Sequence, residues 1–205
     1  MALATWFAFL FASIVLLLIP GPTVLLVVSY SLTQGRKIAL ATAAGVALGD
    51  FTAMTLSLAG LGALLAASAT LFTVLKWIGA VYLVYLGVRL WRAKPVLASV
   101  DAPERSPRSI ILHAFTVTAL NPKSIAFFVA LVPQFIDHAA PLLLQLAVME
   151  ATFIALATVN AVGYALAADT LRGRIRKPAV LTAINRVGAA CLVGLGAVTV
   201  TISRT

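Results

Sequence analysis

The segment LLLIPGPTVLLV at residues 17–28 places two prolines and a glycine in the middle of an apolar run. Proline removes a backbone N–H donor and clashes with the preceding helical turn, and glycine adds backbone freedom. In lipid, non-helical backbone persists at depth only where protein buries it or where it lines a watery cavity. The segment therefore predicts a membrane helix that is broken beside a cavity.

The apolar content of the rest of the chain indicates that lipid is its natural solvent. Of the 205 residues, 62% are hydrophobic and only 10% are charged, and the mean hydropathy is +1.07. Because a spanning helix needs about 20 apolar residues, we expect an all-α polytopic membrane protein with six transmembrane helices. They form a single transporter domain over residues 1–205. The predicted spans are about 4–31, 38–66, 70–90, 110–134, 141–169 and 180–202.

The basic residues are distributed as in a membrane protein with a fixed orientation. The formal net charge is +9, and eleven Lys and Arg residues fall in the connections between spans one and two, three and four, and five and six. The opposite side has only Arg204, so the positive-inside rule places both termini outside. This clustering in short loops argues against nucleic acid as a partner. No Lys or Arg precedes Arg36, which favours a retained first span over a cleaved signal peptide.

The two halves of the chain show signs of an internal repeat. The segments GAVYLVYLG and GAACLVGLG, in the third and sixth predicted spans, match at six of nine positions. Asp50 follows Pro22 by 28 residues, and Glu150 follows Pro122 by the same distance. Two three-span repeats must lie inverted in the membrane, an arrangement typical of secondary transporters with broken helices. The predicted inverted repeats cover about 1–92 and 108–205.

The predicted breaks in helices one and four point to a binding site for an anionic group. A helix that restarts at Pro22 would direct free amides and the positive end of its dipole into the cavity. Asn121 and Pro122 would form the matching break in the second half. The alternative is that each proline only kinks its helix. The candidate residues at the breaks are Pro20, Gly21, Pro22, Asn121 and Pro122.

Three charged residues fall inside the predicted spans. A carboxylate at mid-membrane is costly and functional by default, and it binds a proton more readily than one in water. Asp50 is therefore a candidate for proton exchange. Lys123 could pair with Asp50 or Glu150, could hold a substrate carboxylate, or could extend to the interface. Glu150 is a weaker candidate, because the ends of its span are poorly defined.

The sequence gives no sign of a metal site, a cofactor or an enzymatic active site. Cys191 is the only cysteine, and no His/Cys/Asp cluster has the spacing of metal ligands. No nucleophile elbow or phosphate-binding loop occurs. We therefore expect no cofactor and no catalysis. Gly45 and Gly49 form a GxxxG motif, for which we expect close helix packing.

Two motifs resemble those of the lysine-exporter (LysE/RhtB) family of bacterial amino-acid efflux carriers. They are the early PGP followed by QGRKIALATAAGVALGD, and the midchain LNPKSIAFFVALVPQFI, which is most similar to the homoserine/threonine branch. The resemblance implies proton-driven export across the bacterial inner membrane, with roles for the PGP, for Asp50 and for the Asn-Pro pair. Basic-amino-acid exporters of the family usually carry Asp where this chain has Phe127, so the resemblance favours a neutral amino acid.

Together these features favour a proton-coupled exporter of small neutral amino acids by proton antiport. The substrate carboxylate would sit at the restarted helices, and Asp50 would carry a proton or bind the ammonium. The alternatives are a carrier of the same architecture for another metabolite or ion, and a membrane-embedded enzyme. The sequence leaves open which amino acid is carried and whether the protein is a homo-oligomer.

Overall fold

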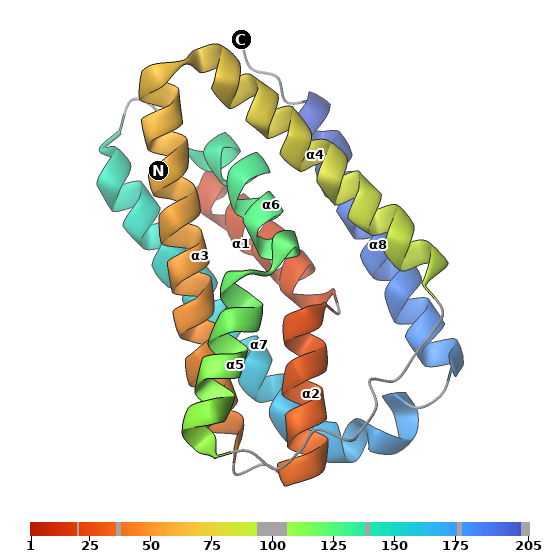
Figure 1. Ribbon diagram of the computed structural model, residues 1–205. Coiled ribbons are helices and arrows are strands. Elements are labelled where there is room, and N and C mark those ends of the chain that lie inside the picture. The colour runs from red at the N-terminus through yellow and green to blue at the C-terminus, as the bar shows by residue number, and fades with distance from the viewer. Residues whose placement is uncertain (20, 36–37, 94–105, 138–139, 176–177, 202–205) are drawn as a thin grey trace.

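The computed structural model describes residues 1–19, 21–35, 38–93, 106–137, 140–175 and 178–201. All regular elements within these ranges are helical, which confirms the predicted all-α class (Figure 1). The elements are α1 (Leu3–Leu18), α2 (Pro22–Gln34), α3 (Ala39–Ala67), α4 (Ala69–Arg92), α5 (Pro107–Ala119), α6 (Pro122–Ala130), the 3₁₀ turn η2 (Val132–Phe135), α7 (Leu142–Ile175) and α8 (Pro178–Thr201).

Several helices have the length and apolar character of membrane spans. Among the described residues, α3, α4 and α7 each qualify alone. The pair α1 and α2 bends by 54°, and the pair formed by α5 and α6–η2 bends by 44°. Counting each bent pair as one span gives up to five spans by length and composition. α8, the sixth predicted span, forms a helix of 24 residues but is not among these candidates, so the six-span inverted arrangement stays a prediction.

Both predicted helix breaks are present. Ile19, which ends α1, is extended at φ −71° and ψ 120°. Gly21 is also extended, and Pro22 opens α2 in the first turn. In the second half, extended Asn121 precedes Pro122 at the start of α6. Proline suits these positions, because the first amides of a helix have no intrahelical partner and its fixed φ is already helical.

α7 is longer than the sequence indicates. We expect the fifth span to end near residue 169, but the helix continues to Ile175. Arg172 and Arg174 therefore lie in the last turns of a helix and not in a loop.

Glycines set the distance between two pairs of helices, and the first pair is α3 and α5. A Cβ on Gly45 would lie 2.5 Å from the Ile111 carbonyl oxygen, and one on Gly49 would lie 2.8 Å from the Phe115 carbonyl oxygen. Both approaches are too close for any larger residue. The prediction of a close-packing GxxxG face is confirmed, and this contact fixes the position of Asp50, the next residue on α3.

The second pair is α4 and α8, which lie side by side along most of their lengths (Figure 1). A Cβ on Gly87 would lie 2.7 Å from a methyl of Val193, and one on Gly196 would lie 2.7 Å from a methyl of Val84. The contact is reciprocal. These glycines belong to the two nine-residue segments that match in sequence.

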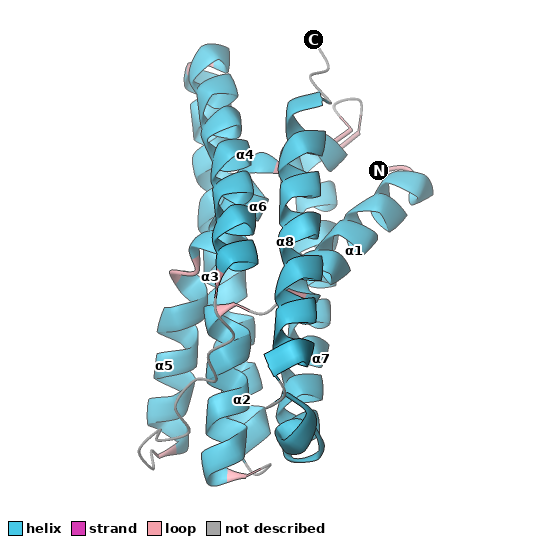
Figure 2. Cartoon of the chain, turned by 90° about the vertical axis from the view of Figure 1, so that its right-hand side faces the viewer, coloured by secondary structure: helices cyan, strands magenta, loops and turns pink. Residues whose placement is uncertain are grey.

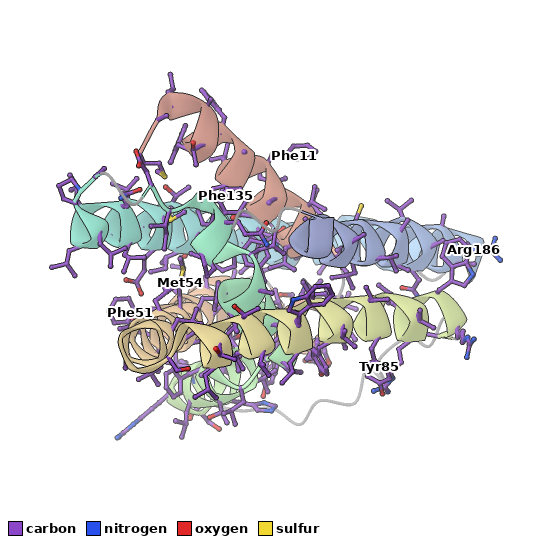
Figure 3. The ribbon with its side chains drawn as sticks, turned by 90° about the horizontal axis from the view of Figure 1, so that it is seen from above. Phe11, Phe51, Met54, Tyr85, Phe135 and Arg186 are labelled. Atoms are coloured by element: carbon purple, nitrogen blue, oxygen red, sulfur yellow. The ribbon has the colours of Figure 1, made fainter. Side chains whose placement is uncertain are left out.

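The interior is aromatic and the outer surface is apolar. Phe9, Phe127, Phe128 and Phe153 are buried together with Met54 in one core cluster. Large apolar side chains also point outward, among them Phe11, Phe51 and Tyr85 (Figure 3). The N-terminal part of α1 leans away from the other helices (Figure 2). An apolar exterior of this kind suits contact with lipid.

The packing of α3 against α5 predicts a position-dependent effect of adding one methyl group. We expect Gly49→Ala to destabilise the protein by about 1–3 kcal/mol, because the nearest atoms are Thr118 Cβ and backbone atoms of Phe115 and Ala119, none of which can rotate away. Gly62→Ala is the matched control on the same helix, since no atom lies within 4 Å of its Cβ position. Thermal unfolding of the purified variants in detergent measures both. Equal unfolding temperatures would contradict the packing argument.

Candidate functional site

The two helix breaks lie near the middle of the molecule (Figure 1). Residues next to both breaks line one small cavity. Its volume is about 20 Å³, enough for about one water molecule. Its lining combines apolar side chains with polar ones from α2, α3, α6 and α7. The polar residues that line it are Thr23, Asp50, Asn121, Lys123, Ser124, Asn160 and Tyr164.

The end of α1 supplies four backbone carbonyl oxygens to this region, those of Leu16, Leu17, Leu18 and Ile19. Each accepts a hydrogen bond from a side chain. A helix leaves its last four carbonyls without an intrahelical partner. Here Asn160 Nδ2 donates to the Leu17 oxygen at 3.2 Å and the Tyr164 hydroxyl donates to the Leu18 oxygen at 3.2 Å. Both donors lie on α7, one turn apart, so one face of α7 caps the broken helix.

Lys123 provides the other two hydrogen bonds. Its Nζ donates to the Leu16 oxygen at 2.9 Å and to the Ile19 oxygen at 2.8 Å. The side chain is 9% exposed. A Cβ on Gly21 would lie 3.4 Å from Nζ, an ordinary van der Waals distance, so the start of α2 lies directly beside the ammonium group. The negative end of the α1 dipole adds to the stabilisation of this cation.

The start of α6 is tied to the start of α2. Asn121 Oδ1 accepts a hydrogen bond from the Lys123 amide at 3.1 Å, and Asn121 Nδ2 donates to Thr23 Oγ1 at 3.2 Å. Thr23 Oγ1 also lies 3.3 Å from Thr118 Oγ1 at the end of α5. In contrast, no side-chain hydrogen bond caps the first turn of α2. The uncapped amides of α2 therefore remain available next to the cavity.

Asp50 is the only acidic residue among the described residues that line the cavity. It is 2% exposed. Within the described part of the chain its carboxylate accepts no hydrogen bond and forms no direct ion pair, but it interacts electrostatically with Lys123. The expected pairing of Lys123 with Asp50 thus takes the form of a longer-range attraction, because the ammonium group is held by backbone oxygens.

The helix ends give the cavity two electrical poles. The C-terminus of α1 carries a negative partial charge, and the N-termini of α2 and α6 carry positive ones. Residues at all three helix ends line the same cavity, namely Leu16 near the end of α1, Gly21 before α2 and Asn121 before α6. A small dipolar ion with a positive and a negative group would find complementary partners here.

Most of the predicted site residues come together, and one does not. Gly21, Asp50, Asn121 and Lys123 line the cavity. Pro22 and Pro122 open the helices that reach it, and Pro20 lies outside the described residues. Glu150 is not among the lining residues.

Glu150 instead accepts a hydrogen bond from the Thr55 hydroxyl of α3. It lies ten residues before Asn160 on α7, or roughly 15 Å along the helix at the usual rise. The structure therefore does not bring Glu150 to the other predicted residues.

Sequence reasoning missed Thr23, Ser124 and Tyr164. Tyr164 follows Asn160 by four residues, and this spacing places both side chains on one face of a helix. That spacing was the available signal. No group of three or more His, Cys, Asp or Glu residues within the described ranges is arranged to hold a metal ion.

Comparisons with known proteins cover nearly the whole chain. The model of the family described as LysE type translocator matches residues 14–203. A protein of Vibrio cholerae named "Uncharacterized membrane protein" is 35% identical over 197 residues, 96% of each chain. The homoserine/homoserine lactone efflux protein of Salmonella typhimurium is 35% identical over 193 residues, 94% of each chain. That of Salmonella typhi is 34% identical over the same length. No solved structure matches with significance.

The capping of α1 predicts a stability effect of one hydroxyl group. We expect Tyr164→Phe to lower the free energy of unfolding by about 1–2 kcal/mol, because the Leu18 carbonyl loses its donor where water is scarce. Tyr85→Phe is the matched control, since Tyr85 is 50% exposed on the outer face of α4. Thermal or denaturant unfolding in lipid nanodiscs compares the two. A larger effect at Tyr85 would argue against the capping role.

Proposed function

The chain belongs to the LysE family of translocators, as its motifs predict, and on that premise we propose that it exports small neutral amino acids of the homoserine or threonine type. We further propose that export is secondary active and coupled to proton antiport. The protein would act as a multi-pass carrier in the inner membrane of a bacterium, with both termini outside.

The observation that carries this proposal is the pair of opposite poles in one cavity. An amino acid at neutral pH has an ammonium and a carboxylate on the same carbon. The uncapped N-terminus of α2, with the start of α6, suits the carboxylate. The carbonyl oxygens of α1 and the Asp50 carboxylate suit the ammonium group. Transporters with broken helices commonly bind substrates in this way near the bilayer midplane.

A neutral side chain on the substrate fits the charges in the cavity. Asp50 is the only acid among the described lining residues, so these residues offer no second carboxylate to a cationic side chain. Phe127 does not support this choice by direct contact, because it is fully buried against Phe153, with 5.9 Å between the ring centroids. The preference for neutral substrates therefore rests on the lining.

The matching halves support an alternating-access mechanism. Each predicted half begins with a bent helix pair, α1–α2 in the first and α5–α6 in the second, and the last helices of the two halves, α4 and α8, pack reciprocally through Gly87 and Gly196. The present cavity of about 20 Å³ is too small for an amino acid, so transport requires the helices around it to separate. We propose that the two halves are inverted repeats that rock about the cavity.

A carrier of the same fold for another small metabolite or ion is the alternative. The Salmonella relatives are named for the efflux of homoserine and of homoserine lactone. The lactone has an ammonium group and no carboxylate. If this chain prefers the lactone, the positive pole contributes less to binding than we propose. Comparing homoserine, homoserine lactone, threonine and lysine in one assay separates these cases.

We expect counterflow into reconstituted vesicles for homoserine and threonine and none for lysine. Asp50→Asn should abolish accumulation driven by a pH gradient, because the neutral side chain cannot exchange a proton. Asp137→Asn, which alters an exposed acid between η2 and α7, is the control and should transport normally. Undiminished gradient-driven transport by Asp50→Asn would remove Asp50 from the mechanism.

The same assay decides the position of Glu150. We propose that it links α7 to α3 through Thr55 and does not contact the substrate. A loss of substrate affinity in Glu150→Gln as large as in Asp50→Asn would return Glu150 to the site.

A further inference from the structure

The ammonium group of Lys123 occupies a place that a substrate ammonium could also occupy. Nζ donates hydrogen bonds to two carbonyl oxygens at the end of α1, that of Leu16 at 2.9 Å and that of Ile19 at 2.8 Å. The side chain comes from α6, whereas the two oxygens that it binds belong to the end of α1. A primary ammonium from any other source could make the same two hydrogen bonds.

We propose that the α1 carbonyl oxygens form the ammonium subsite of the carrier, and that Lys123 occupies this subsite when no substrate is bound. The inference rests on the proposed function for the identity of the substrate. The ligand class is a compound with a primary ammonium group, and Lys123 is its tethered competitor. When the substrate ammonium binds to the carbonyls, the Lys123 side chain is released.

The arrangement is more than is needed to cap a helix. The neighbouring carbonyls of Leu17 and Leu18 are capped by the neutral donors Asn160 and Tyr164. A buried cation is far more costly to place than a neutral donor. Its use at the Leu16 and Ile19 oxygens is explained if the subsite is built for an ammonium group.

Asp50 provides a place for the released lysine. Its carboxylate is 2% exposed and lines the cavity without a hydrogen bond from another described residue. It already attracts Lys123 electrostatically. When substrate binds, the Lys123 ammonium would therefore leave the carbonyl oxygens and pair with the Asp50 carboxylate. The cation is then never buried without a partner.

The geometry also places the substrate carboxylate. Gly21 at the start of α2 has its Cβ position only 3.4 Å from Nζ. An amino acid whose nitrogen replaces Nζ therefore has its carboxylate within reach of the uncapped first turn of α2. Both groups of the zwitterion are satisfied from one position.

Chemical rescue tests the subsite without any transport step. Lys123→Ala removes the ammonium and leaves space, so its unfolding temperature should fall by several degrees. Methylammonium chloride should restore part of that loss, because the small cation can donate to the same carbonyls. Tetramethylammonium chloride has the same charge but no N–H donor and should restore nothing. Arg108→Ala, which removes an exposed cation at the start of α5, is the control and should not respond to either salt.

A binding measurement tests the competition. Homoserine lactone has an ammonium group and no carboxylate, so its affinity reports on the ammonium subsite alone. Removing a competitor that occupies the subsite most of the time should tighten lactone binding to Lys123→Ala by about fivefold or more. Lys123→Gln, which keeps two neutral N–H donors, should bind the lactone with an affinity between those of Lys123→Ala and the unaltered protein.

The outcomes separate this inference from the proposed function. The subsite is overturned if methylammonium does not rescue Lys123→Ala, or if Lys123→Ala binds the lactone no more tightly than the unaltered protein does. In either case, counterflow by the unaltered protein would still support export. Rescue without any amino-acid counterflow would keep the ammonium subsite and overturn the choice of substrate. If Lys123→Ala folds only when methylammonium is present, the subsite is supported, and failure to fold under both conditions overturns it.

Discussion

The structure depends on how the last four carbonyl oxygens of α1 are paired inside the membrane. In water such oxygens bind solvent, but at bilayer depth each must find a donor in the protein. This chain supplies the donors from α6 and α7, at Lys123, Asn160 and Tyr164. The break in α1 is thereby stabilised by contacts between elements more than a hundred residues apart in the sequence. Without those contacts, the break would leave carbonyl oxygens without donors inside the membrane.

The same bonds couple the shape of the site to the helices around it. Any movement that opens the cavity must separate α1 from α6 or α7, and it must offer the freed carbonyls other donors. A ligand with N–H groups can do so, whereas an empty cavity with about one water offers little replacement. Opening is therefore more favourable with substrate present than without it. In the carrier that we propose, this difference would link the opening of the cavity to substrate binding.

Sequence reasoning reached the parts of this arrangement that depend on local chemistry. Proline and asparagine at the two breaks, the close approach at Gly45 and Gly49, and the buried position of Asp50 all follow from rules about short segments. The partners of Lys123 could not be found in that way, because Asp50 and a substrate carboxylate are equally reasonable partners until the end of α1 is placed beside α6. The equal spacing of Asp50 and Glu150 also suggested equivalent roles, but α7 directs Glu150 toward Thr55.

The two helix breaks reach the same cavity, but they are built differently. The first break starts α2 with Gly21 and leaves its amides uncapped, whereas the second starts α6 with Asn121, whose side chain caps the helix. One acid lines the cavity where two equally spaced acids exist in the chain. A symmetric cavity would offer two equivalent anion sites and two carboxylates. Among the described residues, the cavity has one uncapped helix start, one group of carbonyl oxygens and one carboxylate, and this set matches the zwitterion and the proton of the proposed function.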